Sequence, residues 1–152
     1  MSIVVDWRKS QLKGASQTMP KRFAQGVKGF NPFGDLVGLT FTSAGNGNSR
    51  CVLEVNGKHL SPHHTVHGGV TYTMADTGMG AALYSCIDHD EVCSTIEIKI
   101  IYFKQVSIGT LTCDTKVIHK SKRIATLESD IRHDGQLVAK AIGTWSIYKA
   151  KP

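Results

Sequence analysis

A run of small residues between His67 and Cys86 constrains the fold of this chain more than any other segment. Its apolar residues recur with helical rather than alternating spacing, which predicts a helix over residues 67–86. Interior glycines would weaken such a helix in isolation. We therefore expect another element, such as a sheet wrapped around the helix, to pack very close to its axis. The small residues are Gly68, Gly69, Ala75, Gly78, Gly80, Ala81 and Ala82.

Strand-like segments lie on both sides of this helix. Before it, residues 36–42 and 50–55 flank a stretch rich in Gly and Asn, which predicts a β-hairpin. After it come four alternating segments, and Asp134-Gly135 predicts a tight turn between the last two. The first of the four segments places on one face Ile96, Ile98, Ile100 and Tyr102.

Two strands, one helix and four strands in this order indicate an α+β fold. The simplest arrangement is one curved antiparallel sheet wrapped around one long central helix, with the far face of the sheet covered by another subunit. Residues 31–152 form this domain, and Asn31–Gly34 predicts a turn at its start. A polar loop rich in histidine is expected at 56–66. Residues 1–30 form an extension in which Pro20 favours a short helix over Met19–Val27.

Composition and charge narrow the class of protein. The 152 residues suffice for one domain with a real core, and 41% hydrophobic residues are typical of a soluble globular protein. No stretch approaches the roughly 20 apolar residues that span a bilayer, and no signal-peptide core is present, so we expect a cytoplasmic protein with no membrane partner. The four cysteines form no C-x-x-C pair. The net charge of +6 favours polyanions, such as nucleic acid or the phosphates of coenzyme A.

The start of the predicted helix carries the strongest chemical signal. The first N–H groups of a helix have no partner within it and lie at the positive end of its dipole. Gly68 and Gly69 would let a ligand approach them, which suits a polarised carbonyl oxygen and suggests an oxyanion hole. Asp76 lies farther along among small and apolar residues, where an unpaired carboxylate is costly. It therefore indicates either function or a buried hydrogen bond or salt bridge.

Spacing along the helix suggests how these two features combine. His67 and Asp76 are separated by nine residues, so their backbones lie roughly 14 Å apart in one helix. They can hardly act on the same bond within one subunit. If two such helices pack antiparallel across a two-fold axis, the Gly68 end of one meets Asp76 of the other. This arrangement predicts a dimer or a dimer of dimers with active sites shared between subunits.

The sequence His67-Gly68-Gly69, followed by Ala75-Asp76 and a small-residue helix, resembles the hotdog-fold acyl-CoA thioesterases of the phenylacetate-degradation (PaaI-like) type. These enzymes belong to the wider hydroxybenzoyl-CoA thioesterase superfamily. The resemblance extends from about Asn31 to Tyr148. It includes the strand Ile-Glu-Ile-Lys-Ile-Ile-Tyr-Phe and the final Asp-Gly-Gln-Leu-Val-Ala-Lys-Ala hairpin. It implies a hotdog fold and hydrolysis of an acyl-CoA to free acid and coenzyme A, with no metal or cofactor.

The resemblance also implies roles for individual residues. The Gly68 N–H would polarise the thioester carbonyl, with Gly69 beside it in contact with substrate, and His67 would shape the helix start. Asp76 of the partner subunit would act as general base on water or as nucleophile. Thr95, or its neighbour Ser94, would match the hydroxyl residue that positions the attacking water.

Two further parts of the site follow from the same resemblance. The family usually has Asn six residues before the HGG histidine, whereas this chain has Ser61, so that Ser61, His63 or His64 would take that role. Where the family often has a Gly-Lys-Arg turn, this chain has Ser121-Lys122-Arg123, which makes Lys122 and Arg123 candidates for holding the phosphates of coenzyme A. An ordinary charged hairpin turn is the alternative.

Parts of this sequence pattern are compatible with functions other than hydrolysis. A hotdog hydratase or dehydratase would need an acid–base pair aimed at the Cα–Cβ bond. A non-catalytic acyl-CoA-binding module would keep the pocket and lack turnover. His59, His63, His64 and His67 are close in sequence, but Pro62 breaks any helical display and no Cys or acid completes a zinc site. Nucleic-acid binding rests on net charge alone.

Overall fold

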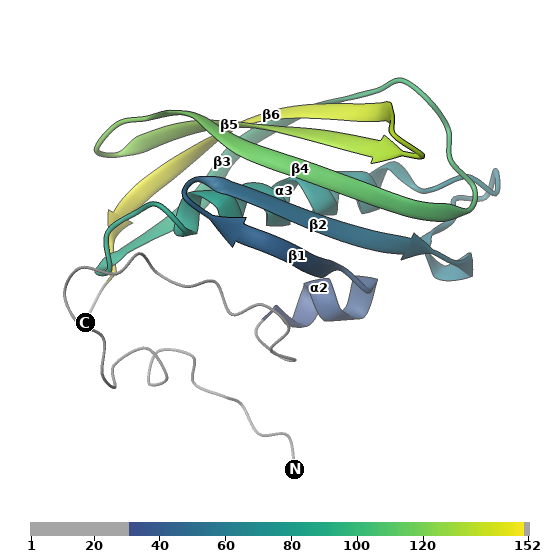
Figure 1. The fold of residues 1–152 in the computed structure, drawn as a ribbon, viewed down its shortest axis with the longest axis horizontal. Helices are drawn as coiled ribbons and strands as arrows, with labels where there is room; N and C mark the ends of the chain where they lie inside the picture. Colours follow the sequence, from purple (N-terminus) through teal and green to yellow (C-terminus); the bar gives the residue numbers. More distant parts are fainter. Residues whose placement is uncertain (1–30, 151–152) are drawn as a thin grey trace, which may run out of the picture.

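The computed structural model describes residues 31–150 and confirms the predicted α+β architecture (Figure 1). One six-stranded antiparallel sheet curves over one long helix, and its strand order is β1-β2-β4-β5-β6-β3. The helices are α2 (Pro32–Val37) and α3 (Gly68–Tyr84), and a 3₁₀ turn, η1, spans Gly57–His59. The strands are β1 (Thr40–Gly45), β2 (Asn48–Val55), β3 (Glu91–Tyr102), β4 (Gly109–Lys120), β5 (Ile124–His133) and β6 (Gln136–Lys149). The short helix expected over residues 19–27 lies outside the described residues.

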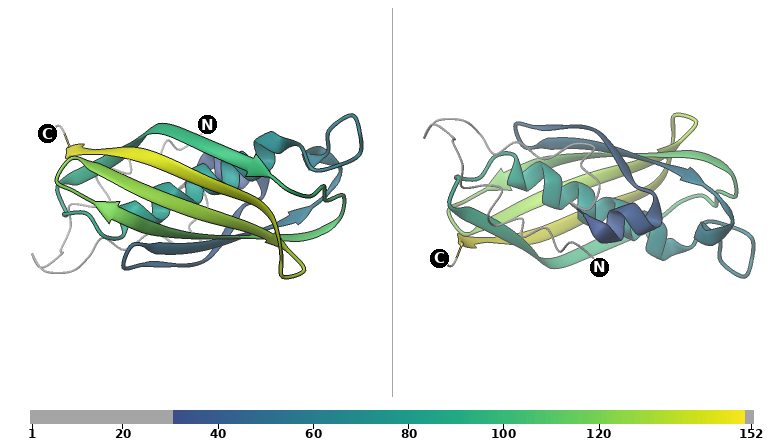
Figure 2. Two further views of the ribbon diagram at one scale, coloured as in Figure 1. Left: turned by 90° about the horizontal axis from the view of Figure 1, so that it is seen from above. Right: turned by 90° about the horizontal axis from the view of Figure 1, so that it is seen from below.

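The sheet packs directly against the small residues of α3, as their pattern predicted. A Cβ on Gly78 would lie 2.7 Å from the Oγ1 of Thr115 on β4, and one on Gly80 would lie 3.1 Å from the Trp145 ring. The Ser49 hydroxyl on β2 donates to the Gly78 carbonyl oxygen at 2.7 Å. Both helices lie on the concave side of the sheet (Figure 2, right). The close approach of helix and sheet therefore depends on glycine within the helix.

The start of the domain differs from the sequence prediction. Residues 32–37 form the helix α2 rather than a turn followed by a strand. The Asn31 side chain caps this helix by accepting from the Gly34 N–H at 3.0 Å, and Pro32 occupies its first position. The helix ends at Gly38, whose φ is 88°, so β1 begins at Thr40 rather than Leu36. The Asn-Pro pair was an N-cap signal rather than a turn signal.

The first strand after α3 also departs from simple alternation. Ile98, Ile100 and Tyr102 share one face of β3, which is the helix side. Ile96, predicted on the same face, is set apart from them because the register of β3 against β6 shifts between Thr95 and Glu97. Ile96 is the extra residue of this β-bulge and is 55% exposed. Because of the bulge, Thr95 pairs with the buried Trp145 and lies on the helix side, whereas strict alternation would direct it outward.

Turns and loops match the sequence where glycine and asparagine determined them. Asn46 and Gly47 have positive φ in the β1–β2 hairpin, and Asp134 and Gly135 have positive φ in the β5–β6 turn. The histidine-rich segment between β2 and α3 is mostly loop and contains η1. None of the described helices is long and apolar enough to cross a membrane.

Candidate active site

The first turn of α3 leaves one backbone donor available. His67 is the N-cap, and its Nδ1 accepts the Gly69 N–H at 2.9 Å. The Val70 N–H donates to the His67 carbonyl oxygen at 2.9 Å. Within residues 31–150, the Gly68 N–H has no protein acceptor. Of the three N–H groups at the positive end of the helix, the one at Gly68 is therefore free for a ligand oxygen.

The N–H of Gly69, which is predicted to contact substrate, is occupied within the protein. Its N–H is already bound to the His67 ring, and a Cβ at this position would lie 3.0 Å from the His67 Nδ1. The absence of a side chain at Gly69 thus makes room for the histidine cap. His67 caps the start of the helix through this hydrogen bond.

Asp76 lies two turns farther along α3 and is half-buried. Its Oδ1 accepts a hydrogen bond from the Thr95 hydroxyl at 2.7 Å. None of the salt bridges among the described residues includes Asp76, so its carboxylate is not neutralised by Lys or Arg. The geometry leaves the second carboxylate oxygen available to a water or a substrate atom.

Thr95 and Ser94, the two hydroxyl residues predicted to act beside Asp76, point to opposite faces of the sheet. Thr95 reaches Asp76, whereas the Ser94 Oγ lies 2.7 Å from the Tyr148 Oη on the other side of the strand. Ser94 pairs with Ser146 on β6, and the Ser146 hydroxyl donates to the Ser94 carbonyl oxygen. The bulge at Ile96 therefore brings Thr95, and not Ser94, to the carboxylate.

Ser61 lies at the base of a small loop that projects between η1 and α3. Its hydroxyl is 3.3 Å from the Thr65 hydroxyl and accepts the His63 N–H at 3.3 Å. His63 and His64 are exposed, and His64 has a φ of 59°. The hydroxyl at Ser61 is thus engaged with its own loop.

His59 has a structural position between α2 and α3. It is buried, its Nδ1 accepts the Asn56 N–H, and its Nε2 lies 2.6 Å from the Val37 carbonyl oxygen. Its own carbonyl oxygen accepts the His67 N–H at 2.8 Å. Residues 31–150 contain no group of three or more His, Cys, Asp or Glu side chains arranged to hold a metal ion.

Lys122 and Arg123 are exposed in the β4–β5 turn, at the opposite end of α3 from Gly68. That turn follows Lys120, on the side of the molecule where Gly47 bonds to Ser85 just beyond the helix C-terminus. The 17 residues of α3 span about 25 Å. Within one chain, the two basic residues are therefore a helix length away from the free Gly68 N–H.

Two of the four cysteines lie in the core between the sheet and α3. Cys51 on β2 and Cys113 on β4 are free thiols that lie opposite each other in the strand register, and both are fully buried against α3. A hydrogen bond with Cys113, together with burial, raises the pKa of the Cys51 thiol. A buried thiol of this kind acts as a core residue rather than as a nucleophile.

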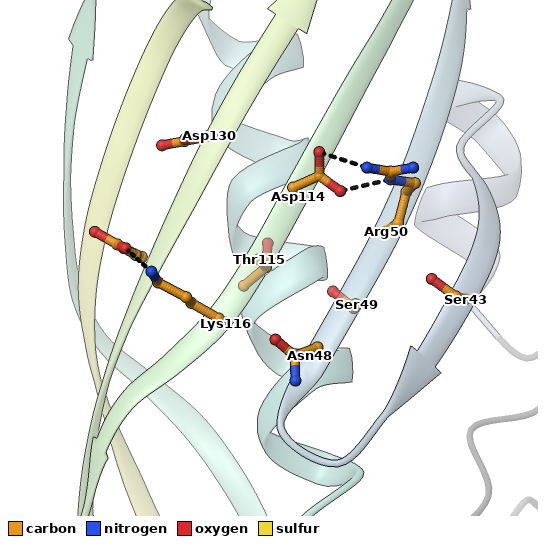
Figure 3. A pocket seen from close by; sticks show the side chains of 9 residues that line it. Ser43, Asn48, Ser49, Arg50, Asp114, Thr115, Lys116 and Asp130 are labelled. Atoms are coloured by element: carbon orange, nitrogen blue, oxygen red, sulfur yellow. Dashed lines mark hydrogen bonds and ion pairs between the residues drawn. The ribbon is translucent and has the colours of Figure 1, made fainter.

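An open depression on the sheet face away from α3 is lined by polar side chains (Figure 3). Arg50 bonds to Asp114 across it, and Lys116 and Lys140 both contact Glu128. The hydrogen bonds from these two lysines lower the pKa of Glu128. Since the charges in the depression neutralise each other and Asp76 and Gly68 are absent from it, we do not place the chemistry there.

Comparison with known proteins identifies the family. A family model described as the thioesterase superfamily matches residues 63–140, which include the whole of α3. The chain therefore belongs to the thioesterase superfamily. The predictions of a hotdog fold and of an enzyme of the thioester hydrolase class are confirmed.

Individual relatives agree with this assignment. A Saccharolobus solfataricus protein named as a candidate esterase is 30% identical over 117 residues, which cover 76% of this chain and 77% of the relative. Human acyl-coenzyme A thioesterase 13 is 26% identical over 67% of this chain and 74% of its own. The crystal structure of a variant of the phenylacetic acid degradation protein PaaI from Thermus thermophilus superimposes with a TM-score of 0.71. It is 27% identical and covers 76% of this chain and 97% of that chain.

Proposed function

We propose that this protein hydrolyses acyl-CoA thioesters at sites formed by two copies of the chain. The observation that carries the proposal is that α3 presents two different functional groups at two positions along its length. Within residues 31–150, one end presents a single free N–H at Gly68, and the middle presents a carboxylate at Asp76 that no Lys or Arg neutralises. A backbone donor for a developing oxyanion and a carboxylate to activate water are the two groups that acyl transfer to water needs.

In the proposed reaction, Asp76 of the partner subunit removes a proton from water while the water oxygen bonds to the thioester carbonyl carbon. The Gly68 N–H holds the resulting oxyanion. When the C–S bond breaks, the thiolate of coenzyme A takes the proton from Asp76, leaving a free carboxylic acid and a thiol. The Thr95 hydroxyl, bonded to Oδ1, holds the carboxylate so that its other oxygen faces the water. These steps use only side chains, one backbone amide and water.

Attack by Asp76 itself is the alternative course. It would form an acyl–aspartyl anhydride that water then cleaves. A single turnover in ¹⁸O-labelled water separates the two, because only the anhydride route can transfer an unlabelled oxygen from the aspartate to the product.

Two features support the shared site. Gly68 and Asp76 are eight residues apart on one helix, so their backbones lie about 12 Å apart in one chain. In addition, β3 is an edge strand of 12 residues that pairs only with β6 among the described strands. Ile96, Ile101 and Tyr102 are each about half exposed along it. A long apolar edge strand is a natural site for pairing with a second copy.

We further propose that Lys122 and Arg123 contact the phosphates of coenzyme A. Both are exposed and face no acidic partner in the ion pairs of the described chain. An antiparallel dimer would bring the β4–β5 turn of one copy toward the Gly68 end of the other. Replacing both residues by Ala should raise KM for acyl-CoA about tenfold and leave KM for the N-acetylcysteamine thioester, which lacks the phosphates, unchanged. Lys99→Ala serves as the control for loss of surface charge.

The first test removes the carboxylate. Asp76→Asn should lower kcat for thiol release by about a thousandfold, with little change in the folding midpoint. Asp134→Asn is the matched control, since Asp134 is exposed in a turn where Asn is equally suitable. If Asp76→Asn hydrolyses at the wild-type rate, the proposed mechanism is wrong. Tight binding of acyl-CoA with no thiol release from the wild-type protein would instead show a binding module.

The second test removes the backbone donor while keeping the helix. Gly68 is the first helical residue, where proline is well tolerated, and the ψ of 135° at His67 suits a residue before proline. Gly68→Pro deletes the N–H, whereas Gly68→Ala adds a Cβ and keeps it. We expect Gly68→Pro to be about a hundredfold less active than Gly68→Ala. Equal activity of the two variants would contradict the assignment of the oxyanion donor.

Mixed dimers test whether sites are shared. Neither Gly68→Pro nor Asp76→Asn should be active alone, but a hybrid of the two contains one intact site if each site takes Gly68 from one copy and Asp76 from the other. Co-expression with two affinity tags should recover roughly half of the wild-type activity per hybrid dimer. No recovery in a purified hybrid would place both groups in the same chain.

A panel of short, medium, long-chain and aromatic acyl-CoA substrates then defines the preferred acyl group. Met74 and Met79, which belong to α3, are fully buried core residues. We assign them no role in specificity.

A further inference from the structure

Tyr102, the last residue of the edge strand β3, contacts the start of α3. Its hydroxyl donates to the Gly68 carbonyl oxygen at 3.0 Å. The contact joins residues 34 positions apart in the sequence. It lies at the same turn that presents the free Gly68 N–H.

The peptide unit between Gly68 and Gly69 is held at both ends. Its carbonyl oxygen accepts from Tyr102 and from the Thr71 hydroxyl, each at 3.0 Å. Its N–H donates to the His67 Nδ1 at 2.9 Å. A hydrogen bond to the carbonyl of a peptide strengthens donation by its N–H, so Tyr102 reinforces the His67 cap through this unit.

The same contact accounts for glycine at position 68. A Cβ on Gly68 would lie 3.1 Å from the Tyr102 hydroxyl oxygen and 3.3 Å from its ring carbon Cζ. Such a side chain would push the tyrosine away from the carbonyl. Glycine at this position therefore makes room for Tyr102 from within the protein, in addition to any room it makes for substrate.

The hydrogen bond between Gly69 and His67 determines the tautomer of a neutral His67 ring. Because its Nδ1 accepts the Gly69 N–H, a neutral His67 ring carries its proton on Nε2. His67 is exposed, so this N–H is presented to the surroundings of the site. His67 is thereby a hydrogen-bond donor on its outer side and not a proton acceptor.

We infer that Tyr102 is a positioning residue for the oxyanion site. This inference rests on the proposed thioesterase mechanism. Tyr102 acts through the Gly68–Gly69 peptide, fixing the orientation of the first turn, the direction of the Gly68 N–H and the tautomer of His67. It does not touch the reacting atoms.

The kinetic test is Tyr102→Phe, which deletes only the hydroxyl. We expect kcat to fall about five- to tenfold with KM unchanged. A less well aligned Gly68 N–H stabilises the oxyanion less, and this loss matters mainly in the transition state, where charge develops on the thioester oxygen. Tyr148→Phe is the matched control. Tyr148 has almost the same exposure, 49% against 51%, and its hydroxyl is also hydrogen-bonded. A rise in KM alone, or an equal loss in both variants, would overturn the positioning role.

A double-mutant cycle tests the link between Tyr102 and Gly68. Gly68→Ala should reduce kcat in the wild-type background, but in a Tyr102→Ala background it should cost little more, because the clash is gone. Strictly multiplicative losses would show that the two residues act separately and would contradict the inference.

A spectroscopic measurement tests, without any turnover, whether Tyr102 positions the first turn of α3. In ¹⁵N-labelled protein, Tyr102→Phe should move the Gly69 amide proton upfield and shift the His67 Nδ1 resonance away from that of a hydrogen-bonded acceptor, while the Tyr148→Phe spectrum keeps both. Unchanged Gly69 and His67 signals would overturn the inference. If the wild-type protein released no thiol from any acyl-CoA, the proposed function would fail, and this spectrum would still report whether Tyr102 holds the first turn.

Discussion

The first turn of α3 and its middle turn are built in contrasting ways. At the first turn, the cap comes from adjacent residues, since the His67 side chain and carbonyl satisfy Gly69 and Val70. At the middle turn, the contacts come from strands far away in the sequence. Thr95 binds Asp76, and Ser49 and Thr115 pack against Gly78.

The contrast shows that one helix carries two kinds of functional group with different origins. A free N–H at a capped helix start is a local property, which the backbone has wherever the capping sequence occurs. The hydrogen bond from the Thr95 hydroxyl to the Asp76 carboxylate, in contrast, forms only when the sheet has assembled around the helix. Damage to the sheet should therefore affect the middle turn more than the first turn.

Among substitutions that leave Gly68 and Asp76 in place, the largest expected effect is on packing at the middle turn. Gly78→Ala would place a methyl group 2.7 Å from the Thr115 hydroxyl oxygen in the core, so either the Thr115 side chain or the helix must shift. We expect the free energy of unfolding to fall by about 1–3 kcal/mol, measured by urea denaturation. Gly57→Ala is the control, because no atom of the described residues lies within 4 Å of a Cβ there. An unchanged urea midpoint for Gly78→Ala would contradict the close packing.

The next effect concerns the hydroxyl beside Asp76. Thr95→Val keeps the shape of the side chain and deletes the hydrogen bond, and we expect about a tenfold lower kcat, equivalent to about 1.4 kcal/mol. Thr95→Ser should restore most of the rate. Ser94→Ala should have the smaller effect, since Ser94 bonds to Tyr148. A larger loss of kcat for the Ser94 variant than for the Thr95 variant would contradict the assignment of Thr95 as the hydroxyl that acts on Asp76.

A smaller effect is expected at the local cap. His67→Ala leaves the Gly69 N–H unsatisfied and should cost about 1 kcal/mol of stability. Asn is a good N-cap, so His67→Asn should recover that stability while lacking the outward imidazole N–H. Thermal unfolding of the three proteins measures the cap, and kcat of the Asn variant measures any further role of the ring. Equal stability of the Ala and Asn variants would argue against capping by the side chain.

The smallest effect lies on the far face of the sheet, away from both turns. Hydrogen bonds from Lys116 and Lys140 hold the pKa of Glu128 below its ordinary value of 4.5. The resulting stabilisation is present above that value and is lost as the pH falls through the lowered pKa. Glu128→Gln should therefore reduce the loss of stability on acidification by a few tenths of a kcal/mol, measured by urea titration at pH 7 and pH 3. Glu97→Gln, on β3 and separated from β5 by β6, should leave that loss unchanged.

Much of the fold was predictable because local signals and topology agreed. The small residues of α3 predicted a close sheet, and alternation predicted β4 to β6, whose buried positions include Leu111, Leu127 and Ala141. The error at Pro32–Val37 arose because Asn-Pro starts helices as well as turns. The choice between Thr95 and Ser94 remained open because a bulge is a mismatch between two strands, and alternation within one strand does not indicate it.

The candidate site divides in the same way. Sequence alone predicted a helix start with open N–H groups at Gly68 and Gly69 and the spacing to Asp76, because hydrogen bonding within a helix depends on neighbours a few residues away. Only the tertiary structure decided that Thr95 faces Asp76 and that Tyr102 holds the Gly68 carbonyl oxygen. Both contacts depend on the register of β3 against β6 and on the depth at which α3 packs, and these follow from the packing of the whole sheet.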